Sequence, residues 1–469
     1  MAESSNGPVR LPEEVRAVNV GLPAFAEAVR AQGGEAVQVD WAIPAEGDPE
    51  AVRALTRLYG AEERYGPANA EVLRRLDSAA PVLVGVARAA DVVPGMADRV
   101  VLHPGPPLPW EAFCDPLRRS VRATVMAEGW AASPEEAERL VAGGAVALEP
   151  ANHHATVVPM AATLGPSASV LVVEDPVGGR RAFSGINQGP GRTPWFGVEA
   201  PEAVERLAFL RDVVGPILDR ALRASPPVDV FSFAAQALLM GDDVHMRTQA
   251  ATNLLIRHLL PALVEEPDAR RAEVARFLSG NHLFFLNVAM AAAKAATAWA
   301  AEVEGSSIVT TMARNGTTFG IRVGADERWF VAPAPPVEDA LFHPGYGPGD
   351  AAPDIGDSAV LELVGLGGAA AAASPAVAAF VGGRMSDAVE RSEAVGRICA
   401  GRSSRFVLPA LDFRGAPLGV DVRRVVELGI TPAINTGILH VAAGTGQVGA
   451  GVARAPMACF REALLALPA

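Results

Sequence analysis

The chain has 469 residues, of which 50% are hydrophobic and 20% are charged, and its formal net charge at pH 7 is −13. This length predicts about two to four domains, and the composition excludes a largely disordered chain. The acidic balance argues against a nucleic-acid partner, because binding phosphates takes an excess of Lys and Arg.

Cysteine usage and the apolar runs bear on compartment and membrane contact. The 3 cysteines lack C-x-x-C spacing, which argues against a disulfide scaffold and a thiolate metal site. The N-terminus reads MAESSNGPVR and contains no apolar leader. The Ala-rich stretches 289–301 and 366–382 fall short of the ~18–20 uninterrupted apolar residues of a membrane span. We therefore expect a soluble, cytoplasmic protein.

Residues 1–104 are expected to form a Rossmann-like α/β domain. A short apolar run ending at Gly21, a helix-period segment and a second run ending at Trp41 indicate a β-α-β unit. Apolar runs at 81–96 and 99–107 continue the alternation, which is typical of a parallel sheet. The first turn lacks the Gly-x-Gly-x-x-Gly pattern, so we predict no dinucleotide site there.

The rest of the chain divides into three expected parts. Residues 105–200 form an α+β segment, in which Ser133 is the N-cap of a helix before Pro134, and loops rich in His and Gly follow. Residues 201–305 form a helical domain, and residues 306–469 form an α+β C-terminal domain. The helices expected in the helical domain are 201–224, 231–260, 267–278 and 282–303. The predicted fold class is therefore α/β multidomain, with an N-terminal Rossmann-like parallel sheet.

The segment Met240–Arg247 concentrates ionisable side chains within a long helical pattern. Residues three or four positions apart on a helix are neighbours, so Asp242 would meet His245 and Asp243 would meet Arg247. Burying such charges is costly unless they are paired or used. The segment predicts Asp242, Asp243 and His245 as catalytic acid/base residues and Arg247 as a substrate ligand. The alternative is a solvated or internally paired helix cap.

Two adjacent histidines, His153 and His154, follow Asn152 in an expected loop. Histidine suits general acid/base work near neutral pH and the polarising of a carbonyl, so both are candidate catalytic residues. The alternative is a pair of structural histidines with satisfied hydrogen bonds. If both converged with His245 and an aspartate, they could hold a divalent metal. No motif spacing supports such a metal site, and no cofactor is predicted with certainty.

A glycine-rich segment, residues 184–197, carries Asn187, Gln188 and Arg192. Glycines let backbone N–H groups approach a ligand, and the amide and guanidinium donors could hold a carboxylate, a phosphate or a developing oxyanion. These three residues are therefore candidate substrate ligands. The alternative is a structural turn at a domain junction.

Later segments add weaker candidates. Arg314 and Asn315 close a predicted strand and could bind an anion, although a hairpin tip explains them almost as well. Lys294, the sole lysine, lies in an Ala-rich helix, where we expect it on an exposed stripe rather than as a buried amine. Residues 435–437 and His440 are candidates to line a cavity. The Gly-x-Gly-x-x-Gly at 444–449 is rejected as a nucleotide site, because no second strand follows it.

Several segments together carry a resemblance to a known family. They read GINQGPGRTPWFG, LLMGDDVHMRTQAATNLL, GNHLFFLNVAMAAAKA, SSIVTTMARNGTTFGIRV, GYGPGDAAPDIGDSA and PALDFRGAPLGVDVRRVVELGITPAINTGI. These resemble the bacterial family of domain-of-unknown-function 1116, which includes a subunit of oxamate carbamoyltransferase from anaerobic allantoin breakdown. The resemblance implies phosphorolysis of oxalurate to oxamate and carbamoyl phosphate, or the reverse. It also implies a Rossmann-type domain joined to helical and α+β domains, and a partner subunit resembling acyl-CoA synthetases.

The chain departs from the family pattern at two places. Ala151-Asn152-His153-His154 stands where relatives have a Cys-His-His-His-like run. Residues 241–247 keep the acidic, His and Arg positions of a Gly-Asp-Glu-Cys-His-x-Arg run but have Asp and Val in its middle. The chain also lacks the Ser-Thr-Arg-Thr and His-Pro-x-Gln patterns of conventional transcarbamoylases. Any carbamoyl transfer would therefore use a different site, and the substrate could differ.

The leading hypothesis is an enzyme, or a catalytic subunit, acting on a carbamoyl or amide C–N bond of a small anionic substrate. His153 or His154 would polarise the carbonyl or act as the acid, Asp242 or Asp243 with His245 would form the acid/base pair, and arginines would hold anionic groups. The first alternative is a non-catalytic subunit of a multi-protein complex. The second is a hydrolase or lyase for another ureido or amide substrate in a biosynthetic pathway. We also expect a homo-oligomer.

Overall fold

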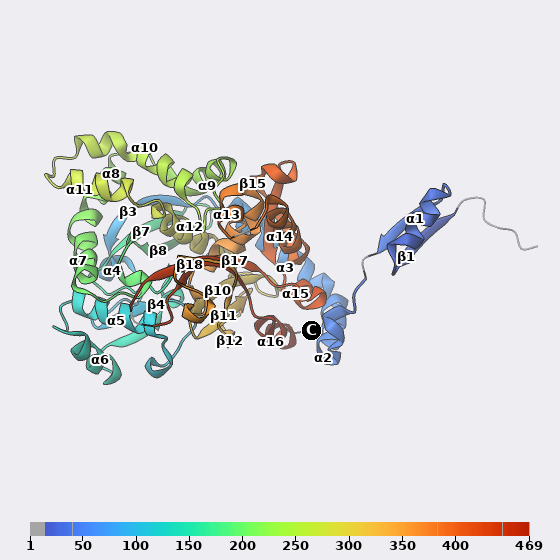
Figure 1. The fold of residues 1–469 in the computed structure, drawn as a ribbon, viewed down its shortest axis with the longest axis horizontal. Helices are drawn as coiled ribbons and strands as arrows, with labels where there is room; N and C mark the ends of the chain where they lie inside the picture. Colours follow the sequence, from blue (N-terminus) through green and yellow to red (C-terminus); the bar gives the residue numbers. More distant parts are fainter. Residues whose placement is uncertain (1–14, 40, 382, 443, 469) are drawn as a thin grey trace, which may run out of the picture.

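The computed structural model describes residues 15–39, 41–381, 383–442 and 444–468. It shows a mixed α/β chain whose sheets are small and separate, with helices packed over and between them (Figure 1). The expected mixture of α/β and helical parts is therefore confirmed. The arrangement of the N-terminal strands differs from the expectation.

The N-terminal strands do not form the single parallel sheet that was expected. β1 (Arg16–Val20) and β2 (Glu35–Val39) pair in parallel around α1 (Pro23–Ala31), and this unit stands apart from the main body at the right of Figure 1. β3 (Val82–Arg88) joins another sheet, where it runs antiparallel to β7 (Ser169–Asp175). Apolar runs identify strands, but pairing depends on tertiary contacts that periodicity does not reveal. The Rossmann-like sheet is corrected accordingly.

The central sheet has the strand order β6-β8-β7-β3-β9; β6 is parallel to β8, and the other neighbours are antiparallel. Its remaining strands are β6 (Thr156–Val157), β8 (Arg180–Gly185) and β9 (Val228–Asp229). β4 (Val100–His103) pairs in parallel with β5 (Ala147–Pro150), so that His103 lies opposite Pro150. This pairing places the end of β4 beside the turn that carries His153 and His154.

Helices of the first half surround these strands. They are α2 (Pro49–Gly60), α3 (Glu62–Ser78), α4 (Ala89–Val92), α5 (Asp115–Ala127) and α6 (Pro134–Ala142). Ser133 caps α6 as predicted, because its Oγ accepts a hydrogen bond from the Glu136 N–H at 3.2 Å. α2 packs against the C-terminal helices α15 (Val422–Leu428) and α16 (Met457–Ala466), so segments far apart in the sequence meet.

The helical stretch follows the prediction except at one break. Its helices are α7 (Pro201–Phe209), α8 (Gly215–Arg223), α9 (Val230–Leu239), α10 (Gln249–Glu265), α11 (Arg271–Ser279) and α12 (Phe284–Ala300). The expected helix 231–260 is interrupted by a loop at 240–248. Gly241 adopts φ = 91°, a left-handed conformation that ends α9.

α12 is buried along most of its length. It runs against β7, β8 and the 3-10 helix η7 (Ser358–Val364), and its alanines let these neighbours approach closely. Lys294 is only 7% exposed, so the prediction of an exposed stripe is wrong: α12 has neighbours on several sides. Within the described residues no single helix is long and apolar enough to cross a membrane; α11 and α12 qualify together but are bent by 83°.

Strands return after α12, as predicted. One sheet has the order β12-β11-β10-β14 and another the order β13-β18-β17, while β15 pairs with β16. The bounds are β10 (Val309–Asn315), β11 (Thr318–Val323), β12 (Phe330–Pro333), β13 (Val337–Phe342), β14 (Ile355–Gly356), β15 (Cys399–Leu408), β16 (Arg414–Val420), β17 (Ala433–Leu439) and β18 (Gln447–Arg454). The helices among them are α13 (Pro375–Phe380) and α14 (Met385–Ile398).

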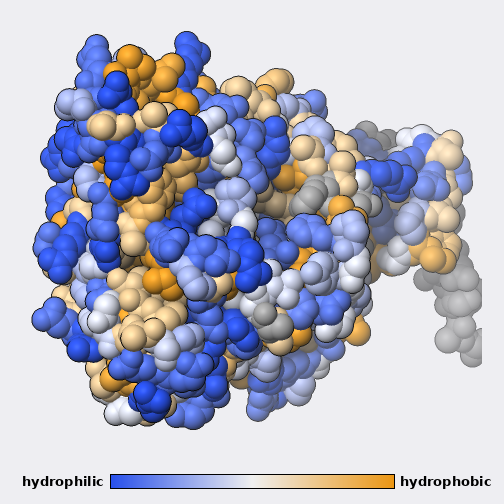
Figure 2. All heavy atoms as spheres, turned by 60° about the vertical axis from the view of Figure 1, so that its left-hand side comes forward, coloured by the Kyte–Doolittle hydropathy of each residue, from blue (hydrophilic) through white to orange (hydrophobic). Residues whose placement is uncertain are grey.

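The buried apolar side chains gather on two sides of the molecule. A hydrophobic cluster surrounds the central sheet and α12, and another lies between β10–β12, β17–β18 and helices α2, α15 and α16. The visible surface is mostly hydrophilic, with apolar side chains gathered at the top of the body, where α10 lies, and on the projecting N-terminal unit (Figure 2). On α10, Leu260 and Val264 are more than half exposed.

Candidate functional site

A cavity of about 550 Å³ lies where α12, the glycine-rich loop, the 240–248 loop and the β17–β18 sheet meet. Its polar wall residues are Arg192, His245, Asn281, His282, His343, Ser358, Thr436, Thr445 and Gln447. Its apolar wall includes Met160, Trp195, Phe196 and Leu286. A mixed wall around a volume of this size suits a small polar molecule held by a few directed groups.

His245 is held in one orientation on the cavity wall. Its Nδ1 lies 2.7 Å from Oε1 of Glu362, and the two side chains are 4% and 2% exposed. A carboxylate accepts hydrogen bonds, so Nδ1 carries the proton and Nε2 keeps a lone pair. Among the described residues Nε2 has no hydrogen-bond partner. The pair therefore has the arrangement of an acid/base group oriented by a carboxylate.

Glu362 is in turn fixed by backbone donors. Its Oε1 accepts hydrogen bonds from the N–H of Gly368 at 3.0 Å and of Asn435 at 3.4 Å. Within the described structure its Oε2 is buried without a partner. Glu362 was not among the predicted site residues. A lone acid in the apolar run of residues 359–373 was the available signal, because buried acids are rare unless they are paired.

Asp243 organises the loop that carries His245. Its Oδ1 accepts hydrogen bonds from the backbone N–H of His245 at 3.1 Å and of Arg247 at 2.8 Å. Its Oδ2 accepts one from Nδ2 of Asn435 at 2.7 Å. The carboxylate thus satisfies backbone donors of the loop, which supports the position of the imidazole.

The side-chain pairs predicted for a helix at this segment are wrong. The segment is a loop, in which Asp242 pairs with Arg247 instead of meeting His245. Asp242 also accepts a hydrogen bond from the Ala251 N–H at 2.9 Å, and burial raises its pKa to about 6. The Arg247 side chain is 33% exposed and is held by Asp242 rather than directed into the cavity.

Behind the cavity wall lies the buried ion pair of Arg314 and Asp354. Nε of Arg314 donates to Oδ2 of Asp354 at 2.7 Å, and both side chains are fully buried. Nη1 donates to Oγ of Ser358 at 3.2 Å and Nη2 to Oγ1 of Thr436 at 3.4 Å. Ser358 and Thr436 line the cavity, whereas Arg314 does not. The guanidinium therefore does not line the cavity itself but holds two hydroxyls that do.

The glycine-rich loop uses its amides internally. Asn187 donates to the carbonyl of Leu283 at 3.0 Å and to Oδ1 of Asn287 at 2.8 Å. Oε1 of Gln188 accepts from the Trp195 N–H at 2.8 Å. Arg192 lines the cavity, and its Nε donates to Glu202 at 3.2 Å with both side chains more than half exposed. Of the three predicted ligands in this loop, Arg192 is the one that faces the cavity.

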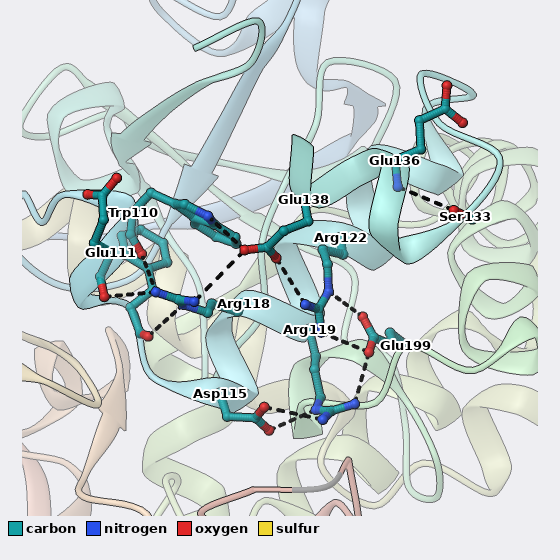
Figure 3. Close-up of polar contacts among 11 residues, drawn as sticks. Trp110, Glu111, Asp115, Arg118, Arg119, Arg122, Ser133, Glu136, Glu138 and Glu199 are labelled. Atoms are coloured by element: carbon teal, nitrogen blue, oxygen red, sulfur yellow. Dashed lines mark hydrogen bonds and ion pairs between the residues drawn. The ribbon is translucent and has the colours of Figure 1, made fainter. Parts of the chain in front are cut away.

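An ion-pair network anchors the end of this loop to α5 and α6 (Figure 3). Glu199 accepts hydrogen bonds from Arg119 at 2.9 Å and from Nε of Arg122 at 2.6 Å. Arg122 also pairs with Glu138 of α6 at 2.9 Å. Because Glu199 follows Trp195 and Phe196 closely in the chain, the network holds part of the cavity wall against the first half of the protein.

Comparison with known proteins assigns this chain to a family. The family model of oxamate carbamoyltransferase subunit AllG matches residues 146–358. The chain is 42% identical to oxamate carbamoyltransferase subunit AllG of Escherichia coli over 406 residues, covering 85% of this chain and 97% of that protein. The chain belongs to the AllG family.

Two further relatives support the shared fold of this AllG-family chain. The uncharacterized protein YahG of Escherichia coli is 36% identical over 458 residues, which is 97% of each chain. A crystal structure of a conserved protein of unknown function from Enterococcus faecalis has a TM-score of 0.85 and 37% identity, covering 87% of this chain and 98% of that one. The resemblance inferred from the sequence motifs is confirmed by these matches.

The histidine pair predicted as catalytic in this AllG-family chain lies away from the cavity wall. His154 is bound by both ring nitrogens, Nδ1 to the carbonyl of Pro94 at 2.7 Å and Nε2 to Glu149 at 2.7 Å. His153 is more exposed; its Nε2 accepts from Nε1 of Trp329 at 3.0 Å, and burial beside the charge of Arg322 lowers its pKa. The two do not converge with His245 on one cavity.

Asn315 has a structural position in the β10–β11 hairpin. Its Oδ1 accepts from the N–H groups of Thr317 at 3.1 Å and Thr318 at 2.7 Å, and its Nδ2 donates to the carbonyl of Pro106 at 3.1 Å.

Two histidines that line the cavity, His282 and His343, were not predicted from the sequence. Among the described residues, no group of three His, Cys, Asp or Glu side chains is placed to hold a metal ion.

Proposed function

We propose that this chain is a catalytic subunit of an oxamate-carbamoyltransferase type of enzyme and that the cavity beside His245 binds its small anionic substrate. The observation that carries the proposal is the buried His245–Glu362 pair on the wall of a cavity in an AllG-family chain. The relative in Escherichia coli is named as a subunit of oxamate carbamoyltransferase. A buried, oriented imidazole supports acid/base chemistry on a C–N bond.

The reaction needs a proton at one nitrogen. In phosphorolysis, an oxygen of hydrogenphosphate attacks the ureido carbonyl carbon of oxalurate, and the bond from that carbon to the oxamate nitrogen breaks. The attacking phosphate oxygen stays bonded to the carbamoyl carbon, which gives carbamoyl phosphate. Oxamate is the leaving group, and its nitrogen receives the proton of hydrogenphosphate. We assign the relay of this proton to Nε2 of His245, with Glu362 stabilising the imidazolium. In reverse, Nε2 removes a proton from oxamate as its nitrogen attacks carbamoyl phosphate.

The remaining wall groups serve the anion and the carbonyl oxygen. Arg192 lines the cavity, and its guanidinium, which donates to Glu202 through Nε, has the geometry that matches a carboxylate or phosphate. The hydroxyls of Ser358 and Thr436 both accept hydrogen bonds from Arg314. Thr436 gives its own proton to Oδ1 of Asp354 at 2.9 Å, whereas the O–H of Ser358 is left to donate into the cavity. A donor at this position supports the negative charge that develops on the attacked carbonyl oxygen.

The test is substitution of His245 in the assembled enzyme. We expect His245→Asn to lower kcat for phosphate-dependent cleavage of oxalurate by at least ~10²-fold, as is typical for an acid/base residue. His258→Asn is the matched control: this histidine binds the carbonyl of Pro226 at 2.9 Å and is not on the cavity wall. A His245→Asn enzyme with the wild-type melting temperature and unchanged turnover would refute the assignment.

A second measurement separates catalysis from assembly. We infer that the chain works inside a complex, because the named relative is a subunit, and we expect turnover only after mixing with a partner resembling acyl-CoA synthetases. Full turnover by the isolated chain would contradict this dependence. If instead the mixed complex keeps full turnover with His245→Asn, the chain has the non-catalytic role.

A further inference from the structure

A second set of polar side chains lies buried around Lys294, and neither the cavity nor the His245 pair uses it. Nζ of Lys294 donates to Oδ1 of Asn152 at 3.1 Å, and these side chains are on residues 7% and 6% exposed. His103, at the end of β4, is 1% exposed and lies beside the same turn, because it pairs with Pro150. Arg322 of β11 completes this group, which we call the Lys294 cluster.

Charged groups in and beside the Lys294 cluster affect one another's pKa. Burial is the main cause that lowers the pKa of Lys294, His153 and His103. The charge of Arg322 lowers the pKa of Lys294 and His153 further, and His153 adds a smaller effect at His103. At the surface, Arg322 lies 5.9 Å from the ring of Trp329, which donates to His153. The Lys294 cluster therefore lies beneath the exposed His153 and the half-buried Trp329.

Three polar atoms of the cluster have no partner among the described residues: His103 Nε2, Asn152 Nδ2 and Arg322 Nε. Nδ2 and Oδ1 belong to one amide group, so the free donor of Asn152 lies beside Nζ of Lys294. Leaving a buried polar atom unpaired costs about 1–3 kcal/mol, so each of these three atoms would gain from a bound partner.

The chemistry of these atoms defines what would satisfy them. Asn152 and Arg322 offer N–H donors, and Lys294 has N–H groups beyond the one that binds Asn152. His103 differs, because its Nδ1 lies 2.8 Å from the carbonyl of Pro104 and must donate to it. Its Nε2 is then a lone pair that needs a donor, and burial keeps the ring neutral by lowering its pKa to about 4.

The cluster carries positive charge with little compensation. No carboxylate lies within ion-pair distance of Nζ of Lys294 in the described chain. Asp357 is near enough for its charge to oppose the lowering of the Lys294 pKa. Its oxygens, however, accept hydrogen bonds from the N–H groups of Gly105 and Val158. The Glu327 partner of Arg322 is 3.8 Å away and 93% exposed. An anion would therefore find two cations and an amide donor.

We propose that the Lys294 cluster is a second ligand site, which binds a small oxyanion that also carries one O–H or N–H donor. Its oxygens take the donors of Lys294, Asn152 and Arg322, and its own donor goes to Nε2 of His103. Hydrogenphosphate and oxamate both have this combination, whereas sulfate offers oxygens alone. The site is separate from the cavity wall and does not depend on the reaction assigned to His245.

The sole lysine of the chain makes the site directly observable. Protein labelled with ¹³C at the lysine Cε, without lysines in any tag, has a single labelled side chain, which reports on Lys294 however many ligands bind elsewhere. At pH 7 this amine is mostly charged, because burial lowers its pKa only to about 8. We expect inorganic phosphate, oxamate or both to shift the Lys294 resonance saturably, and sulfate to bind at least about tenfold more weakly, because its oxygen would face the His103 lone pair.

Substitutions locate the effect within the cluster. Arg322→Gln and Asn152→Ala are each expected to weaken the binding that shifts Lys294 by about tenfold or more. Arg322 is partly exposed, so Arg322→Gln remains informative if Asn152→Ala does not fold. His245→Asn is the control: it tests turnover at the cavity and leaves the Lys294 shift intact. A resonance unmoved by phosphate and oxamate, equal binding of sulfate, or an undiminished shift in Arg322→Gln would each overturn the proposal.

Discussion

Buried ionisable side chains in this protein fall into two kinds. Arg314 and Asp354 satisfy each other directly, and both are completely buried. Asp357 and Lys294 lie near each other without forming an ion pair, and burial shifts each toward its neutral form. A buried charge without a direct partner is costly, so the second kind makes stability depend on pH.

Asp357 gives a pH-dependent prediction. Burial raises its pKa to about 7, more than the N–H groups of Gly105 and Val158 offset. Because this pKa lies above the usual value of 3.8, its stabilising contribution is present below about pH 4 and is lost as pH rises through about 7. Asp357→Asn does not titrate, so the free energy of unfolding of the wild type minus that of the variant should fall across this window.

The change is expected to be on the order of a few kcal/mol, measured by urea unfolding of both proteins on each side of the window. Asp98→Asn, at an exposed position, is the control and should leave the difference nearly constant. A wild-type-minus-Asp357→Asn difference that is the same at pH 4 and above pH 7 would show that Asp357 keeps an ordinary pKa.

At the scale of elements, the candidate site depends on how η7 and the 240–248 loop meet. η7 supplies Ser358 and Glu362, and the loop supplies His245. Gly367 begins the next 3-10 helix, η8 (Gly367–Ala373), and its N–H donates to the carbonyl of Asp243 at 2.8 Å. A glycine is needed there, because φ is +59° and an added Cβ would touch Glu362 and lie 2.9 Å from Nδ1 of His245.

Gly367→Ala is therefore expected to disturb the acid/base pair without removing either partner. The Cβ would push Glu362 away from His245, and we expect turnover to fall at least about tenfold, since displacements of about 1 Å can cost this much or more. Gly129→Ala is a matched control, because Gly129 also has positive φ (+74°) but an added Cβ meets nothing within 4 Å. Equal activity in the two variants would contradict the role of the η7–loop contact.

At the scale of the whole molecule, the N-terminal β-α-β unit packs mainly on itself. β1, α1 and β2 contact one another, and Figure 1 shows them projecting from the body. Val18, Phe25 and Val37 are each more than 60% exposed, so the unit adds little to the buried core. The division of the rest into domains ending at 200 and 305 stays a prediction.

Removal of residues 1–41 should leave the body folded. Because the buried clusters begin with residues of η1 (Pro44–Gly47) and α2, we expect the truncated chain to melt within about 2 °C of the full chain, which for a chain of this size is a loss of about 2 kcal/mol or less. Thermal unfolding followed by circular dichroism checks this. A much lower melting temperature would show that the unit stabilises the body through contacts beyond its own strands.

Local patterns in the sequence determined many of the elements. Ser133 before Pro134 marked the start of α6, and the apolar periods marked α7, α8, α11 and α12, because capping and amphipathic spacing act within a few residues. The motifs also determined the family, and His245, Arg192 and Thr436 were recognised as site candidates. Local patterns could not predict which other residues would line the cavity beside them.

Tertiary structure alone decided which of these residues meet. Glu362 orients His245 across 117 positions of sequence, and no periodic pattern encodes such a contact. Residues 240–248 form a loop instead of the expected helix, because the Asp243 carboxylate accepts hydrogen bonds from the backbone N–H of His245 and from the side chain of Asn435, which is distant in sequence. Strand partners and the burial of Lys294 were decided in the same way. Local preferences determine elements over a few residues, whereas pairing, burial and shared cavities are set by long-range packing.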